Sequence, residues 1–444
     1  MFTLAAGAVF AQGRCVGEEP PDIEPAAQRV AADALAQLHL LARAAVARSQ
    51  SVGAARLLAE AAEADSEEVL AGLQPQAAIG ANLGPKWNHA SLGGSLGALD
   101  GQLSLSLSRL IDDGGRTRHL VESRRLLAEA ARRGEGSAQE QVVLATVQGA
   151  LELARLRVQQ RIYDQYGRKM ACLVEALETV VAADRGRASE LVQARKSAQQ
   201  VEISRAQQQS QSRQAELRLR RLVGDAPIEP LSPDALVAAM PSLPELPRLL
   251  ADAERAPELR QLGAQAAAQA RAADAADAAR KPQLSWVMGV GGSTSIGAAG
   301  GTRHGASLGV ALNLSLPVLA PAVDANVAAA RRRAAAATAQ LDDALESRRA
   351  QVREVHEQLL AARARAERVR GVLASSDQVR NATLQQWQQL GRRSLFDVIA
   401  AETEHYSLRL AHVDAMFEGQ VLAASLWALG PGVRSAFEPA APAR

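Results

Sequence analysis

The residues most suggestive of chemistry are Glu402 and His405, three positions apart among helix-forming residues. A Glu-x-x-His spacing places a carboxylate and an imidazole one helical turn apart, as in di-iron helical bundles. Such a bundle needs a second Glu-x-x-His and two further glutamates, and the sequence contains no second copy. His405 also shares a helical stripe with Val398 and Leu408. We therefore expect it to pack or to contact solvent rather than to bind a metal.

Other candidate reactive groups have even less support. Gly289–Gly292 is glycine-rich, but no Gly-Lys-Ser/Thr follows, so it does not match a phosphate-binding loop. Two cysteines, Cys15 and Cys172, are too few for a disulfide framework or a zinc site. No Ser/His/Asp or Cys/His set has supporting context. We predict no catalytic residue, no cofactor and no metal site.

The composition favours long helices. The 444 residues are rich in alanine, glutamine and arginine, and only 3% are aromatic. The net charge of +2 comes from interspersed acids and bases, without a basic patch that would indicate a nucleic-acid partner. No run of about 18 apolar residues could form a membrane-spanning helix.

Two stretches alternate strictly between apolar and small or polar residues, which predicts strands with one apolar face. The first is 102–111, where leucine and serine alternate, and the second is 308–316. They match at an offset of 207 positions, which aligns Leu103 with Val310, Leu105 with Leu312 and Leu107 with Leu314.

The same offset extends well beyond these strands. Pro282-Gln283 corresponds to Pro75-Gln76, and the correspondence continues to Ala194 and Ala401. One register held over this length indicates a tandem duplication. Each copy reads as helix, strand, long loop, strand, very long helix, break and helix.

This pattern defines the expected domains. We expect part of a signal peptide at 1–11, which lacks a basic start, and a first repeat at 12–224 with a β-hairpin at 75–112. A proline-rich connector follows at 225–256. A second repeat at 257–432 has its β-hairpin at 282–319, and a disordered tail covers 433–444. Within the hairpins, the glycine- and serine-rich stretches 84–101 and 291–305 read as long loops.

Four strands in two hairpins leave unpaired edges, which neither water nor lipid tolerates well. In a bilayer only a closed barrel pairs every strand. One chain has too few strands for a barrel, whereas three copies related by cyclic symmetry supply twelve. We then expect the apolar face to contact lipid. Its predicted lipid-facing residues are Leu103, Leu105, Leu107, Val310, Leu312 and Leu314.

The duplicated plan and two motifs resemble the TolC family of outer-membrane efflux and secretion channels. The motifs are the stretches 105–115, with its Asp-Asp-Gly-Gly end, and 391–398, Gly-Arg-Arg-Ser-Leu-Phe-Asp-Val. The resemblance covers about residues 30–432. It implies a mainly α-helical channel-tunnel with a membrane β-barrel, in which each protomer of a homotrimer supplies four strands and long coiled-coil helices.

The resemblance also implies where the channel closes. The family's periplasmic tip lies at helix–helix turns, here 184–191 and 391–398. Asp397 matches the aperture aspartate of the family, Arg393 matches a basic residue tied to closure, and Glu190 is the first-repeat counterpart of Asp397. A ring of three such carboxylates would favour cations. Family members often carry a second aspartate where this chain has Ala400, and an Arg393–Glu190 contact would tie the two repeats together.

The implied function is a passive exit duct of a tripartite export system in the Gram-negative outer membrane, with its helical tunnel in the periplasm. Its partners would be outer-membrane lipid, a periplasmic adaptor (membrane fusion protein) and an inner-membrane ABC transporter or RND pump. The 391–402 stretch favours type I protein secretion, and multidrug or small-molecule efflux is the alternative. A poreless periplasmic coiled-coil scaffold or adaptor is the alternative from another class.

Overall fold

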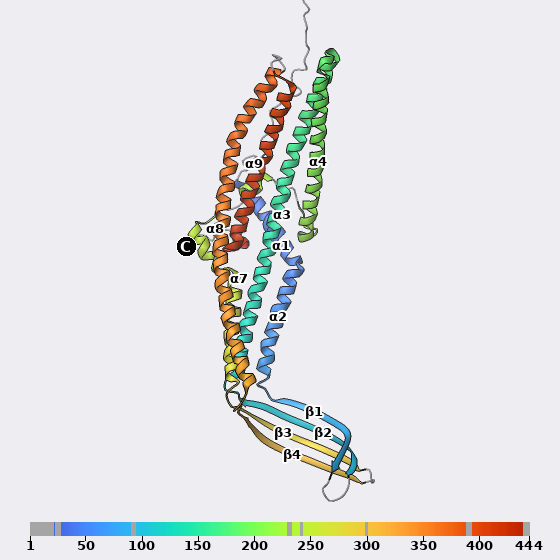
Figure 1. The fold of residues 1–444 in the computed structure, drawn as a ribbon, viewed down its shortest axis with the longest axis vertical. Helices are drawn as coiled ribbons and strands as arrows, with labels where there is room; N and C mark the ends of the chain where they lie inside the picture. Colours follow the sequence, from blue (N-terminus) through green and yellow to red (C-terminus); the bar gives the residue numbers. More distant parts are fainter. Residues whose placement is uncertain are drawn as a thin grey trace, which may run out of the picture. The chain divides into compact units, whose positions relative to one another are not determined.

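The computed structural model describes residues 22, 28–89, 95–228, 233–239, 243–297, 301–387 and 393–437. The predicted signal peptide, Cys15 and residues 391–392 lie outside these ranges. The helices are α1 (Gln28–Arg48), α2 (Gln50–Ala71), α3 (Arg116–Ala183), α4 (Ala188–Val223), α5 (Pro233–Ala239), α6 (Leu246–Ala253), α7 (Pro257–Ala278), α8 (Pro321–Gln385), α9 (Leu395–Leu429) and α10 (Val433–Phe437) (Figure 1). The strands are β1 (Gln76–His89), β2 (Ser95–Asp112), β3 (Gln283–Gly297) and β4 (Thr302–Ser315).

The chain forms two compact units, and each unit takes residues from both sequence repeats. One unit comprises residues 1–50, 138–256 and 347–444, and the other comprises 51–137 and 257–346. We call them the tip unit and the sheet unit. The two units therefore do not coincide with the two sequence repeats, because α3 and α8 each contribute residues to both units. No helix within the described ranges combines the length and the apolar content needed to cross a membrane.

The sheet unit holds one four-stranded antiparallel sheet in the order β1-β2-β3-β4 (Figure 1). The two hairpins are joined through β2 and β3, where Leu105 pairs with Val290. Most of the predicted loop residues belong to strands, so the loop prediction for 84–101 and 291–305 was wrong. The reason is compositional. Glycine and serine, which indicate loops in a soluble protein, here lie within long strands, for example at Gly101, Gly292 and Ser293.

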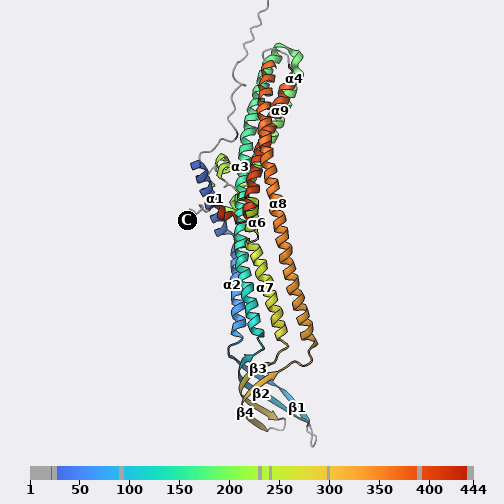
Figure 2. The same cartoon turned by 90° about the vertical axis from the view of Figure 1, so that its left-hand side faces the viewer.

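Helices α2, α3, α7 and α8 lie side by side in that order next to the sheet (Figure 2). The α2–α3 contact includes an ion pair between Arg132 and Glu63, and the α3–α7 contact includes the Ser123 hydroxyl, which donates to the Ala268 carbonyl at 2.9 Å. A small cluster of Ala273, Ala276, Val327 and Ala330 closes the α7–α8 contact. Alanine at these positions allows the two helices to approach closely.

The turn between β2 and α3 is built by two aspartates. The Asp112 carboxylate accepts from the Gly114 N–H at 3.1 Å, and the Asp113 carboxylate accepts from the Thr117 N–H at 2.8 Å at the start of α3. Gly114 has a φ of 65°, and the Lys281 side chain covers it and donates to its carbonyl at 3.0 Å. This left-handed turn fixes how the strand passes into the helix.

The tip unit has its core along α3. An apolar stripe of this helix is buried at Val147, Leu151, Ala154, Val158 and Ile162. Side chains of α1, α4, α5, α9 and α10 complete the same cluster, which includes Leu38, Leu219, Leu236, Tyr406 and Val433.

The predicted proline-rich connector at 225–256 contains two short helices, α5 and α6, which bury Leu236 and Leu249. Each of these helices begins with a proline in its first turn, where a missing N–H costs nothing. Residues 433–437 of the predicted disordered tail form α10, with Val433 fully buried.

Candidate functional site

Asp397 lies in the first turn of α9 and forms a capping box with Ser394. The Asp397 carboxylate accepts from the Ser394 N–H at 3.1 Å, and the Ser394 hydroxyl accepts from the Asp397 N–H at 3.3 Å. Two otherwise unsatisfied N–H groups of the helix start are thus bonded. The side chain that we predicted as a gate residue also fixes the start of its own helix.

These bonds lower the pKa of Asp397 below its ordinary value, chiefly through the Ser394 N–H, with smaller contributions from the Ser394 hydroxyl and the Arg393 charge. A depressed folded-state pKa means that the carboxylate stabilises the cap at neutral pH. This stabilisation is lost only as the pH falls through the folded-state pKa. Asp397 therefore carries a full negative charge from about pH 8 down to about pH 5.

Glu190 and Arg393 bond elsewhere within the protomer. Glu190 is paired with Arg187, one turn earlier, at 3.0 Å. Arg393 is exposed and donates to the Gln386 side-chain oxygen at 3.3 Å. The Arg393–Glu190 contact expected from the sequence is absent among the described residues of one protomer. A neighbour three positions away is reached at a lower entropic cost than one on the other hairpin.

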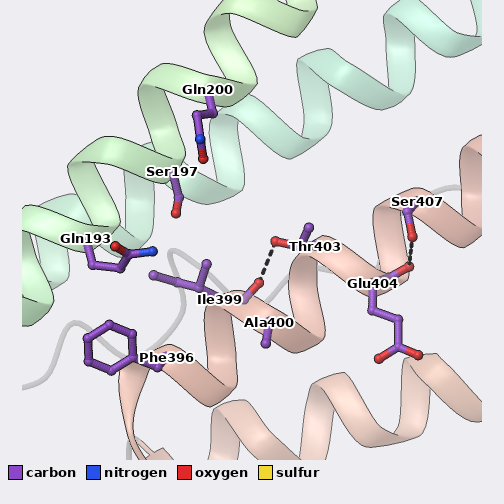
Figure 3. Close-up of a pocket in the computed structure, with 9 residues that line it drawn as sticks. All are labelled: Gln193, Ser197, Gln200, Phe396, Ile399, Ala400, Thr403, Glu404 and Ser407. Carbon is purple, nitrogen blue, oxygen red and sulfur yellow. Dashed lines mark hydrogen bonds between the residues drawn. The ribbon is translucent and has the colours of Figure 1, made fainter.

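A surface groove runs between α4 and α9 and includes Phe396, the residue before Asp397 (Figure 3). Its volume is about 560 Å³. The lining residues are Gln193, Ser197, Gln200, Phe396, Ile399, Ala400, Thr403, Glu404 and Ser407. Most are small or polar, and the Thr403 and Ser407 hydroxyls bond back to carbonyls of their own helix at 2.7 Å. The side chains that line the groove therefore protrude little, so another helix could approach closely.

Behind this groove, Glu402 is fully buried in a group of ionic side chains. It forms ion pairs with Lys169 of α3 at 3.5 Å and with Arg380 of α8 at 3.9 Å. The Lys169 and Arg380 side chains are only 10% and 7% exposed. Arg380 also bonds Asp377 at 2.8 Å. This cluster joins three helices that are far apart in the sequence.

His405, the other half of the Glu-x-x-His motif, is buried one turn after Glu402 in α9. Its ring lies edge-on to the Tyr406 ring, with the two ring centroids 5.7 Å apart. Tyr406 stacks on Tyr166 at 4.3 Å, and the Arg409 guanidinium lies 5.1 Å from the Tyr406 ring centre. Arg409 is also paired with Asp22. Within the described ranges, no group of three or more His, Cys, Asp or Glu residues could hold a metal ion.

In the sheet unit, the strand register places the six predicted lipid-facing residues on one face. Leu103, Leu105 and Leu107 pair with Gly292, Val290 and Met288. Val290 and Met288 pair in turn with Leu308 and Val310. Leu312 and Leu314 follow on the same face, opposite Trp286 and Leu284. The other face is polar, with Ser104 and Ser106 hydroxyls bonded to carbonyls of β1.

Several of these residues escaped the sequence analysis. The Ser-x-x-Asp pattern of Ser394 and Asp397 is a recognisable capping signal that could have been read. Arg187 could have been found as a partner of Glu190 from its three-residue spacing. Lys169 and Arg380 carry no such signal, because they reach Glu402 only through tertiary packing.

No family model and no curated protein matches the sequence. Solved structures do match its fold. One of them is CusC, whose structures show conformational changes that accompany folding and transmembrane channel formation. CusC matches with a TM-score of 0.76 and 20% sequence identity, and the match covers 89% of this chain and 92% of CusC. The outer membrane protein VceC of Vibrio cholerae matches with a TM-score of 0.73 and 20% sequence identity, over 89% of this chain and 96% of VceC. The open state of the Neisseria gonorrhoeae MtrE outer membrane channel matches with a TM-score of 0.71 and 18% sequence identity, over 94% of this chain and 96% of MtrE. The chain therefore has the fold of the TolC-like outer-membrane channels.

Proposed function

We propose that the protein is a passive export channel of the Gram-negative outer membrane, without catalytic activity, whose helical part stands in the periplasm. The observation that carries this proposal is the sheet with two unlike faces and two edges, β1 and β4, that have no strand beside them within the described chain. An open edge and an exposed apolar face are costly in water. A closed barrel in a membrane removes both costs.

The apolar face has the dimensions that a membrane requires. It extends from Leu284 to Ile296 along β3, which is about 40 Å of strand. A strand tilted by about 40° would span about 30 Å of bilayer over that length, the thickness of a bilayer's hydrocarbon core. Trp286 and Arg109, paired across β2 and β3, suit a membrane–water interface at one end of the band.

We propose a homotrimer because four strands per copy give a twelve-stranded barrel. Since the strands alternate in direction and four is even, β4 of one copy meets β1 of the next antiparallel, so the ring closes without a mismatch. Membrane fractionation and gel electrophoresis test this point. We expect a heat-modifiable trimer in the outer membrane. A monomer in the soluble periplasm would favour the scaffold alternative.

We propose that the α4–α9 groove receives an α-helical hairpin of the periplasmic adaptor, which connects the channel to an inner-membrane transporter. The groove includes Phe396, the residue before Asp397, and its small side chains, such as Ser197 and Ala400, allow close helix packing. Ala400 is exposed on this floor, so a large side chain there should block docking without disturbing the core.

Ala400→Arg should reduce export at least about ten-fold, which corresponds to about 1.4 kcal/mol of lost adaptor affinity. Ala400→Ser is the matched control and should retain export. Both variants should form trimers and conduct ions in planar bilayers, since neither touches the sheet. Normal export by Ala400→Arg, at wild-type protein levels, would place the adaptor elsewhere.

We propose Asp397 as the constriction residue, with Glu190 and Arg393 beside it on the tip turns. Three Asp397 carboxylates in a narrow pore would favour cations. Asp397→Asn keeps an oxygen for the Ser394 N–H while removing the charge. We expect it to lower the K⁺/Cl⁻ permeability ratio several-fold. For the wild type we expect that ratio to stay constant from about pH 8 to about pH 5. A ratio unaffected by Asp397→Asn would place the constriction elsewhere.

For the cargo, we propose polypeptides delivered by an ABC transporter, as in type I secretion. The polar face of the sheet supports this choice, because much of it is glycine, serine and alanine, which would leave a wide lumen. Deletion of the ABC transporter that shares the adaptor should abolish secretion of its protein substrate. Unchanged secretion together with sensitivity to small toxic compounds would instead indicate an efflux pump.

A further inference from the structure

The polar face of the sheet is uncharged along most of its length. Its cross-strand rows contain small or neutral residues from the helix end of the sheet to the row of Asn82, Gln102, Ser293 and Gly305. Two of these rows consist only of glycine, serine and alanine, namely Ala78-Ser106-Gly289-Gly309 and Gly80-Ser104-Gly291-Ser307. Any charged residue on this face must therefore lie at the end of the sheet that is farther from the helices.

That end is where β1 passes to β2 and β3 passes to β4. The next row is Gly84-Asp100-Ser295-Arg303, and the row after it begins with Lys86. Strand alternation places Lys86, Asp100 and Arg303 on the same face as the serines. Arg303 and Asp100 stand two strands apart, about 9.6 Å. Among the described residues, no ion pair joins any of the three charges to another group.

If the proposed trimeric barrel is correct, this face lines its lumen. We infer that Lys86, Asp100 and Arg303 then form a charge ring with six cations and three anions, which makes the barrel section favour anionic solutes. The ring deepens the proposed function by naming a second element of selectivity. Its sign is opposite to that of the Asp397 carboxylates.

The size of the effect follows from Coulomb's law and screening. Three charges on the wall of a twelve-stranded barrel should change the anion/cation permeability ratio on the order of two-fold in 0.1 M salt. The effect should grow in 0.01 M salt, because the Debye length rises from about 10 to about 30 Å.

The test is the reversal potential of single channels in planar bilayers under a KCl gradient. Arg303→Gln and Lys86→Gln should each lower the Cl⁻/K⁺ permeability ratio about two-fold in 0.1 M salt, and Asp100→Asn should raise it by a similar factor. Arg109→Gln is the matched control. It removes one positive charge from the same sheet, but on the apolar face, and should leave the ratio unchanged.

The outcomes separate this inference from the proposed function. A conducting wild type whose ratio shifts in opposite directions with Arg303→Gln and Asp100→Asn supports the ring. A conducting wild type with an unchanged ratio in all three ring variants overturns the ring while leaving the channel intact. A shift with Arg109→Gln alone also overturns it, because the faces would be reversed. A wild-type trimer that never conducts contradicts the channel itself, and the ring with it.

Discussion

Replacing Glu402 by alanine is expected to cost about 3–5 kcal/mol of unfolding free energy. The substitution leaves the Lys169 and Arg380 charges buried after removing the carboxylate that they face. Removing one partner of a buried ion pair is costly, because the remaining charge keeps its desolvation cost and loses that attraction. Glu402→Gln, which retains the size and an acceptor oxygen, should cost less than alanine.

Glu404→Ala provides the matched control on the same helix. Glu404 is exposed on the groove side, so its removal should change stability by no more than about 0.5 kcal/mol. Urea denaturation, monitored by the helical signal in far-UV circular dichroism, would compare the unfolding midpoints of the variants. Equal midpoints for Glu402→Ala and Glu404→Ala would show that the buried cluster does not stabilise the tip unit.

The second large effect is expected on the apolar face of the sheet. Leu308 lies in the middle row of that face, with Ile79, Leu105 and Val290 across the neighbouring strands. Leu308→Arg would place a charge near the bilayer midplane, which costs about 2–4 kcal/mol in an outer-membrane barrel. Leu312 lies in the row of Trp286 and Arg109, so Leu312→Arg should cost less.

Ser307→Arg is the control, since Ser307 is the adjacent residue on the polar face. It should insert normally, with its side chain in the lumen. Refolding into lipid vesicles, followed by the heat-modifiable trimer on a gel, measures insertion. Equal loss of insertion for Leu308→Arg and Ser307→Arg would mean that the face assignment is wrong.

Much of the sheet could be predicted because β-structure has a two-residue period. Leucine and serine alternate so regularly around Leu105 that the strand and its apolar face follow from the sequence alone. The strand ends could not be predicted, because residues such as Gly84, Gly101 and Gly292 interrupt the alternation there and are typical of loops. The pairing of β2 with β3 was also beyond reach, since Leu105 and Val290 come from different repeats.

At the tip, local chemistry outweighed the contacts expected from the family resemblance. Glu190 pairs with Arg187 rather than Arg393, because a partner one turn away is always within reach. Asp397 was expected within the helix–helix turn 391–398 and lies in the first turn of α9, and its bonds to Ser394 were missed. The buried Glu402 cluster forms only where three helices pack together. No spacing of residues in the sequence predicts that these helices lie side by side.

The most direct test of a barrel closed by three copies is a covalent bond across its seam. A photo-crosslinking amino acid at Val310, on the edge strand β4, should react with the β1 strand of a neighbouring copy. We predict denaturing-gel products at two and three times the 46.7 kDa chain mass, with the adduct mapped to residues 76–89. Only the single-chain mass, or an adduct mapped to a helix or to another protein, would contradict the trimeric channel.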